Sequence, residues 1–107
     1  MTANPTQSSV PAASRVPATP VRALMMDPAR LTEQHRFYLD LLPFLAESGF
    51  TMLWWHFCDD EGCAIRLDSH PELAAPHAFS KGEIRDFVAA AAEHGIDVVP
   101  EVETLGH

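Results

Sequence analysis

The chain has 107 residues, of which 47% are hydrophobic, and seven basic and 15 acidic side chains give it a formal net charge of −8. The charge and the scattered basic residues argue against a nucleic-acid partner, because phosphate binding requires clustered Lys and Arg. No apolar run approaches the roughly 20 residues of a membrane span, and the N-terminus lacks the pattern of a secretory signal. A cytoplasmic location, away from membranes, is the default expectation.

The first 20 residues differ in composition from the rest of the chain. Residues 1–20 hold four of the nine prolines, with Ser, Thr and Ala between them. Such a segment buries too little apolar surface to offset its ordering entropy, which predicts a flexible leader. Order is expected to begin at Val21, with a short strand over residues 22–26 that ends at Asp27.

A helix is predicted over residues 31–48, because apolar side chains recur there at three- and four-residue spacing. These side chains are Phe37, Tyr38, Leu41, Leu42, Phe44 and Leu45. Thr32 is the expected cap and Gly49 the expected stop. Pro43 lies inside this segment, and an interior proline removes a backbone donor. We therefore expect a bend or an early end of the helix at Pro43.

The next elements are a strand and a second helix. Residues 50–57 form an almost continuous apolar run, which is typical of a strand covered on both faces. An irregular connection over residues 64–79 follows. Ser80 and Glu83 then have the spacing of a capping box, which opens a helix. Gly95 is the expected stop of this helix.

A third strand is predicted over residues 96–102. The order strand, helix, strand, helix, strand makes the strands parallel when the crossovers are right-handed. Their carboxyl ends then meet at one edge, which is the catalytic face of an α/β barrel. The sequence therefore predicts an α/β fold in which residues 21–107 are the N-terminal β-α-β-α-β portion of a (β/α)8 TIM barrel, truncated after the third strand.

Two groups of acids follow the predicted strands. Asp59, Asp60 and Glu61 come directly after the buried second strand; on composition alone they fit a solvated turn, but their position favours a functional site. Glu103 lies near His107 after the third strand. A carboxylate that holds an imidazole fixes its tautomer and supports its charge, although a lone His after Gly can also be an ordinary loop residue.

Other polar residues have two interpretations. Arg22 flanks the first apolar run and is either an exposed surface residue or a guanidinium that binds a sugar diol. Trp54, Trp55 and His56 are interpreted as packing groups rather than as a sugar platform. Cys58 and Cys63 flank a turn, and their spacing leaves a disulfide and two free thiols both open. With two Cys residues, the chain cannot build a four-thiolate zinc site.

Together these residues resemble the catalytic domain of glycoside hydrolase family 20, the β-N-acetylhexosaminidases. Residues 22–27 are similar to the pattern R-G-x-x-x-D, and residues 53–62 to L-H-W-H-L-T-D-D-Q-G. Residues 69–73 fit S-x-P-x-L, and residues 98–107 resemble V-I-P-E-I-D-x-P-G-H. The chain departs from the family at several positions, which are Ala23, Cys63, Ala64, Glu103 and Leu105.

The resemblance implies retaining hydrolysis of a terminal β-linked N-acetylhexosamine in a glycan or glycoconjugate, without a cofactor or metal. The acetamide oxygen of the substrate acts as the nucleophile. Arg22 would bind sugar hydroxyls, Asp59 or Asp60 and His107 would support the general acid, and Glu103 would orient His107. The adjacent Asp-Glu pair that performs the chemistry would follow His107, so the 107 residues alone are expected to be inactive.

Two alternatives come from other functional classes. One is a catalytically silent fragment that binds carbohydrate. The other is a metal-dependent hydrolase, because carboxylates and imidazole suit several divalent ions. Its ligands would be Asp59, Asp60, Glu101 and His107.

Overall fold

The computed structural model describes residues 20–31 and 33–105. The predicted leader up to residue 19, the Thr32 cap and His107 lie outside the described residues. Among the residues that the structure describes, no helix has the length and hydropathy of a membrane-spanning segment.

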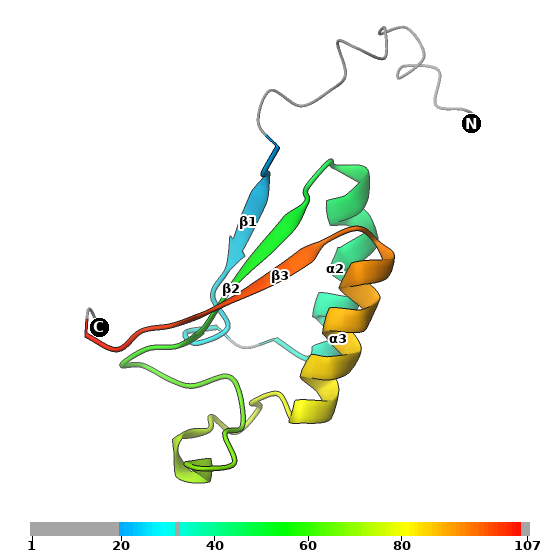
Figure 1. Cartoon of the computed structure of the whole chain (residues 1–107). Coiled ribbons are helices and arrows are strands. Elements are labelled where there is room, and N and C mark those ends of the chain that lie inside the picture. The colour runs from blue at the N-terminus through cyan, green and yellow to red at the C-terminus, as the bar shows by residue number, and fades with distance from the viewer. Residues whose placement is uncertain (1–19, 32, 106–107) are drawn as a thin grey trace, which may run out of the picture.

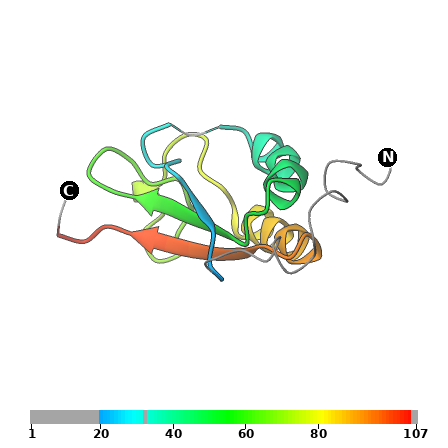
Figure 2. The same ribbon diagram turned by 90° about the horizontal axis from the view of Figure 1, so that it is seen from above.

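Three parallel strands form one sheet in the order β1-β2-β3 (Figure 1). The strands are β1 (Ala23–Met26), β2 (Met52–Cys58) and β3 (Asp97–Val102). Two helices, α2 (His35–Glu47) and α3 (Lys81–Glu93), connect them. The predicted α/β order and the parallel strands are confirmed. As Figure 2 shows, β2 and β3 run in the same direction, so their carboxyl ends lie together at one edge.

The core lies between the sheet and the helices. Leu53, Trp55 and Phe57 alternate along β2 and are at most 3% exposed. The Trp55 ring packs against Phe87 of α3 and Tyr38 of α2, at centroid distances of 4.4 and 5.2 Å. The side chains between them point to the other face of the sheet, because successive residues of a strand alternate.

That other face is only partly covered in the described part of the chain. Trp54 is 42% exposed, so the prediction of a strand covered on both faces was wrong for this position. The reason is that both helices pack on the side of Trp55. Toward the end of β2 the same face is covered, and it carries the buried His56 among polar groups.

Helix α2 differs from its prediction in two ways. It begins at His35 after an N-cap residue, Gln34, whose side chain makes no capping bond. Pro43 does not end it, because Pro43 is exposed and the carbonyl that loses its donor can bind water. Of the apolar side chains expected to pack, Phe37 and Phe44 remain 42% and 62% exposed.

The cap of α3 and the glycines after both helices follow their predictions. Ser80 accepts a hydrogen bond from the backbone of Glu83, and the Glu83 side chain accepts one from the backbone of Ser80, which confirms the capping box of α3. Gly49 and Gly95 follow the two helices with positive φ angles of 87° and 71°. Glycine adopts this conformation without the steric cost of a side chain.

Replacement of Ser80 by alanine should lower the free energy of unfolding by about 1 kcal/mol, because it leaves the backbone N–H of Glu83 at the start of α3 without its acceptor. Urea denaturation of the two chains measures the difference. Ser48→Ala is the matched control, because Ser48 caps the end of α2 through its backbone N–H. Equal losses in the two variants would contradict the role of the Ser80 side chain.

Candidate functional site

Polar side chains gather where the three strands end. Asp27 follows β1, Asp59 follows β2, Glu101 lies on β3 and Glu103 follows it. Asp27, Glu101 and Glu103 line a hollow of about 260 Å³, together with Met25, Arg30 and His56. The predicted meeting of acids at one edge of the sheet therefore takes place.

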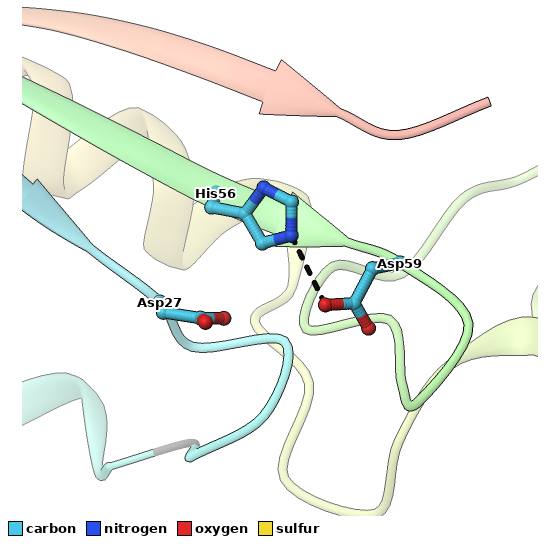
Figure 3. Close-up of side chains that lie close together, drawn as sticks. All are labelled: Asp27, His56 and Asp59. Atoms are coloured by element: carbon cyan, nitrogen blue, oxygen red, sulfur yellow. Dashed lines mark hydrogen bonds and ion pairs between the residues drawn. The ribbon is translucent and has the colours of Figure 1, made fainter. Parts of the chain in front are cut away.

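The Asp59 carboxylate is the centre of this cluster. Its Oδ1 accepts hydrogen bonds from the backbone N–H groups of Glu61 and Gly62, at 2.8 and 3.3 Å. Its Oδ2 lies 3.1 Å from Nε2 of His56 (Figure 3). The same oxygen lies 2.8 Å from Nε of Arg30. The side chain has no exposed surface.

These contacts decide the charge of Asp59. Burial alone would raise its pKa, but the hydrogen bonds from Glu61, Arg30, His56 and Gly62 hold the pKa well below its usual range. Asp59 is thus a fixed anion and a poor proton donor. The contribution of this ionised state to stability is present above the ordinary Asp value of about 3.9 and is lost as the pH falls toward the folded value.

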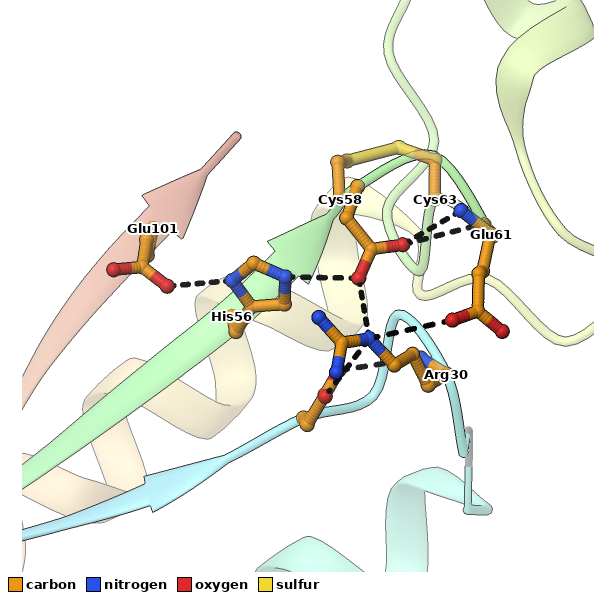
Figure 4. Close-up of polar contacts among 9 residues, drawn as sticks. Arg30, His56, Cys58, Glu61, Cys63 and Glu101 are labelled. Carbon is orange, nitrogen blue, oxygen red and sulfur yellow. Dashed lines mark hydrogen bonds and ion pairs between the residues drawn. A yellow bond between two sulfur atoms is a disulfide. The ribbon is translucent and has the colours of Figure 1, made fainter. Parts of the chain in front are cut away.

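His56 comes from the face of β2 away from the helices and lies opposite Glu101 in the register of the sheet. It is 5% exposed, and its Nδ1 lies 2.5 Å from Oε1 of Glu101 (Figure 4). Burial lowers the pKa of the imidazole, but the hydrogen bonds to Glu101 and Asp59 outweigh that effect and raise it. The interpretation of His56 as a packing group missed this role.

Arg30 is supplied by the turn after β1. The backbone N–H of Arg30 donates to Oδ1 of Asp27 at 3.2 Å, and the backbone N–H of Leu31 donates to the Asp27 carbonyl at 3.2 Å. The guanidinium lies between carboxylates: its Nε is 3.5 Å from Asp27, 2.8 Å from Asp59 and 3.7 Å from Glu61. The hydrogen bond to Asp59 raises the pKa of Arg30.

Arg22 is placed elsewhere. It precedes β1, and its guanidinium lies beside Gly49, where a Cβ atom would come within 2.6 Å of it. Gly49 precedes β2, so Arg22 lies at the amino-terminal edge of the sheet. The guanidinium that the structure brings to Asp59 is that of Arg30. The rule that sites form at the carboxyl ends of barrel strands is the signal that points to Arg30 in the sequence.

The other predicted residues have separate positions. Asp60 is exposed and lines a second hollow with Glu103. The backbone N–H of Glu103 donates to the carbonyl of Cys58 at 2.9 Å, which holds the end of β3 beside the turn after β2. His107 lies outside the described residues, so its contact with Glu103 stays a prediction.

Cys58 and Cys63 form a disulfide, one of the two states that the sequence left open. It closes the turn that carries Asp59. Backbone hydrogen bonds from Asp59 to Gly62 at 3.0 Å and from Ala64 to Phe57 at 2.8 Å lie on either side of it. The disulfide and these bonds together make a short hairpin that fixes the Asp59 backbone.

Possible metal ligands also come together here, in the two groups Asp27-His56-Asp59 and His56-Glu101-Glu103, whose donor atoms lie within 4.8 Å of one another. Both groups depend on His56, whose two nitrogens already contact carboxylates. A metal ion bound to Asp59 would also lie next to the Arg30 guanidinium, which repels it. These ion pairs hold the cluster together and occupy both nitrogens of His56.

Parallel strands that bring a guanidinium, an imidazole and carboxylates to their carboxyl ends have the layout of an α/β enzyme site. Residues 20–107 match the model of glycosyl hydrolase family 20, catalytic domain. The chain belongs to this family.

Individual relatives agree with the family match. A β-hexosaminidase of Emericella nidulans is 31% identical over 96 residues, which are 85% of this chain and 16% of that protein. The GH20 β-N-acetylhexosaminidase of Streptomyces coelicolor has a TM-score of 0.78 at 26% identity, over 85% of this chain and 21% of its own. The GH20 exo-β-N-acetylglucosaminidase of Vibrio harveyi, solved with N-acetylglucosamine, has a TM-score of 0.79 at 27% identity, over 86% of this chain and 18% of its own. The chain thus spans about a fifth of these proteins.

Replacement of Gly62 by alanine should disrupt the cluster, because a Cβ atom there would lie 2.6 Å from the backbone carbonyl oxygen of Ala29. A backbone atom cannot move aside as a side chain can, so the turns that carry Arg30 and Asp59 must separate. The expected result is a lower midpoint of thermal unfolding.

Gly82→Ala is the matched control, because its Cβ would lie 3.9 Å from Oγ of Ser80, an ordinary van der Waals distance. Alanine is the better helix former in α3, so this change should stabilise the chain by up to about 1 kcal/mol. A Gly62→Ala chain as stable as the parent would show that the two turns do not depend on their close approach.

Proposed function

We propose that residues 21–107 are the β-α-β-α-β start of a (β/α)8 barrel that hydrolyses terminal β-linked N-acetylhexosamine from glycans. The family match and the names of the relatives support the reaction class. The observation that carries the proposal in this chain is the Arg30–Asp59 ion pair at the carboxyl edge of the sheet, beside a hollow with further carboxylates.

In this proposal Arg30 takes the sugar-binding role that the sequence suggested for Arg22. A planar guanidinium can donate to two neighbouring hydroxyl oxygens at once. Asp59 fixes the guanidinium through the contact with its Nε and remains charged, so it organises the site without transferring a proton. Its four hydrogen-bond donors leave this carboxylate no need to reorganise when a sugar enters.

The chemical step needs two more groups in the substrate-assisted retaining mechanism. One carboxylate orients the acetamide, whose oxygen attacks the anomeric carbon, and one carboxylic acid protonates the leaving oxygen. We assign both to an adjacent Asp-Glu pair that follows His107 in the whole enzyme. Glu103 would orient His107, and His107 would support the proton donor.

Two other functions can be tested against this one. A silent carbohydrate-binding fragment would bind N-acetylglucosamine but show no turnover in any longer polypeptide that includes these residues. A metal-dependent hydrolase is favoured only by the proximity of the possible ligand atoms. Its turnover would be lost after treatment with a chelator and restored by a divalent ion, whereas the proposed mechanism predicts no change.

The 107-residue chain alone should not hydrolyse a chromogenic β-N-acetylglucosaminide, because the proton donor lies outside it. A longer polypeptide with the proposed Asp-Glu pair should hydrolyse it. Side-by-side assays at equal concentration make the comparison. Turnover by the short chain at the rate of the longer one would contradict the assignment of the missing acids.

In that longer polypeptide, Arg30→Ala should weaken binding of an N-acetylhexosamine analogue by about ten- to a hundredfold, the usual value of hydrogen bonds to a charged group. Binding is measured by calorimetry, separately from turnover. Arg36→Ala is the control, because Arg36 is an exposed residue of α2 that pairs with Asp40. A loss confined to Arg22→Ala would return the sugar-binding role to Arg22.

A further inference from the structure

Each of the two nitrogens of the His56 ring contacts a carboxylate. Nδ1 lies 2.5 Å from Glu101 and Nε2 lies 3.1 Å from Asp59. At 5% exposure, the ring has little access to water that could replace either partner. A neutral imidazole has one N–H and donates to one carboxylate, whereas an imidazolium donates to both. Both hydrogen bonds are complete only when His56 is charged.

Charged groups face His56 from the ends of all three strands. They are Asp27 and Arg30 after β1, Asp59 after β2, and Glu101 and Glu103 at the end of β3. Carboxylates outnumber the one guanidinium in this set. Burial lowers the pKa of His56, and the contacts with Glu101 and Asp59 and the charge of Asp27 raise it above the ordinary value. The imidazolium is thus the second cation of the site.

One oxygen atom joins the two cations. Oδ2 of Asp59 contacts both Nε2 of His56, at 3.1 Å, and Nε of Arg30, at 2.8 Å. The contact of His56 with Glu101 is the shorter of its two, and shorter charge-assisted hydrogen bonds are stronger. Nδ1 should therefore keep its proton when the imidazolium loses one. Nε2 would then turn a lone pair toward Oδ2, and the two acceptors repel each other.

We infer that His56 is a positioning residue for Arg30: held by Glu101, the charged ring fixes the Asp59 carboxylate on which the guanidinium rests. Loss of the proton from Nε2 lets both Asp59 and Arg30 shift. The inference rests on the proposed function only in naming a sugar as the ligand of Arg30. The coupling between the two cations is a property of the chain itself.

The direction of the pH effect follows from the form of His56 that donates a hydrogen bond from Nε2 to Asp59. Only the protonated ring donates this bond while it also donates to Glu101. The ordered arrangement is therefore present at low pH and is lost as the pH rises through the titration of folded His56. Protonation of the Asp59 carboxylate sets the acid limit, because the neutral acid no longer pairs with the imidazolium. Sugar binding through Arg30 would weaken above the His56 midpoint.

NMR of the ¹⁵N-labelled chain tests the coupling without sugar or turnover. The ring nitrogens of His56 report its charge, and the Nε–Hε group of Arg30 reports the contact with Asp59. His56 should titrate with a midpoint above the ordinary value of about 6.5. The Arg30 signal should change with the same midpoint.

Glu101→Gln tests whether the Arg30 signal follows the charge of His56, which we call a relay, or titrates independently of it. Glutamine keeps the shape of the side chain and removes its charge, so the His56 midpoint should fall by about one pH unit or more. Glu101 and Arg30 lie on opposite sides of the His56 ring (Figure 4). A relay therefore predicts that the Arg30 midpoint falls by the same amount, and His56→Gln should remove the pH dependence of the Arg30 signal near neutral pH.

His77→Gln is the control, because it removes an exposed imidazole and should leave both midpoints in place. An Arg30 signal that stays constant while His56 titrates would overturn the inference, as would a His56 midpoint at or below the ordinary value. The wild-type titration decides the matter even if Glu101→Gln does not fold. A chain that shows the coupling but binds no sugar would count against the proposed function alone.

Discussion

The Asp59 carboxylate is the group on which the polar site depends. It accepts hydrogen bonds from the backbone of its own turn, from an imidazole on β2 and from a guanidinium after β1. A carboxylate with no exposed side-chain surface must be paired in this way, because an isolated buried charge is costly. The ionised Asp59 is therefore stable only when the turn after β1, the turn after β2 and strand β2 lie together.

Backbone geometry supplies the conditions for these contacts. The parallel register sets His56 opposite Glu101, and the alternation along β2 sends Trp55 into the core and His56 to the other face. Gly62 lets the Asp59 turn approach the carbonyl of Ala29, which brings Arg30 within reach. The disulfide closes the same turn at its base. The site is thus built by the sheet and its turns rather than by the helices.

The sequence was sufficient to predict the order of elements, because apolar periodicity and capping residues are local signals. Ser80 and Glu83 formed the expected capping box. Helix α2 was harder, because an exposed Pro43 can sit in a helix without ending it, and Phe37 and Phe44 follow the helical period without being buried. Periodicity shows which face of a helix is apolar, but not which residues of that face pack against another element.

The candidate site was predicted in outline. Asp59 and Glu103 were predicted because each follows a strand. The place of Arg30 in the cluster was not predicted, because a motif drew attention to Arg22, which precedes its strand and lies at the amino-terminal edge of the sheet. His56 was missed because its neighbours are aromatic, and only the pairing of β2 with β3 reveals Glu101 beside it. Contacts between strands far apart in sequence are not local signals.

We propose that this edge of the sheet binds an N-acetylhexosamine through Arg30. An NMR titration of the chain with N-acetylglucosamine, followed at arginine side chains and backbone amides, tests this proposal. We expect saturable shifts at Arg30 and in the turns after β1 and β2, and none of comparable size around Arg22 and Gly49. Saturable shifts confined to the amino-terminal edge, around Arg22, would contradict it.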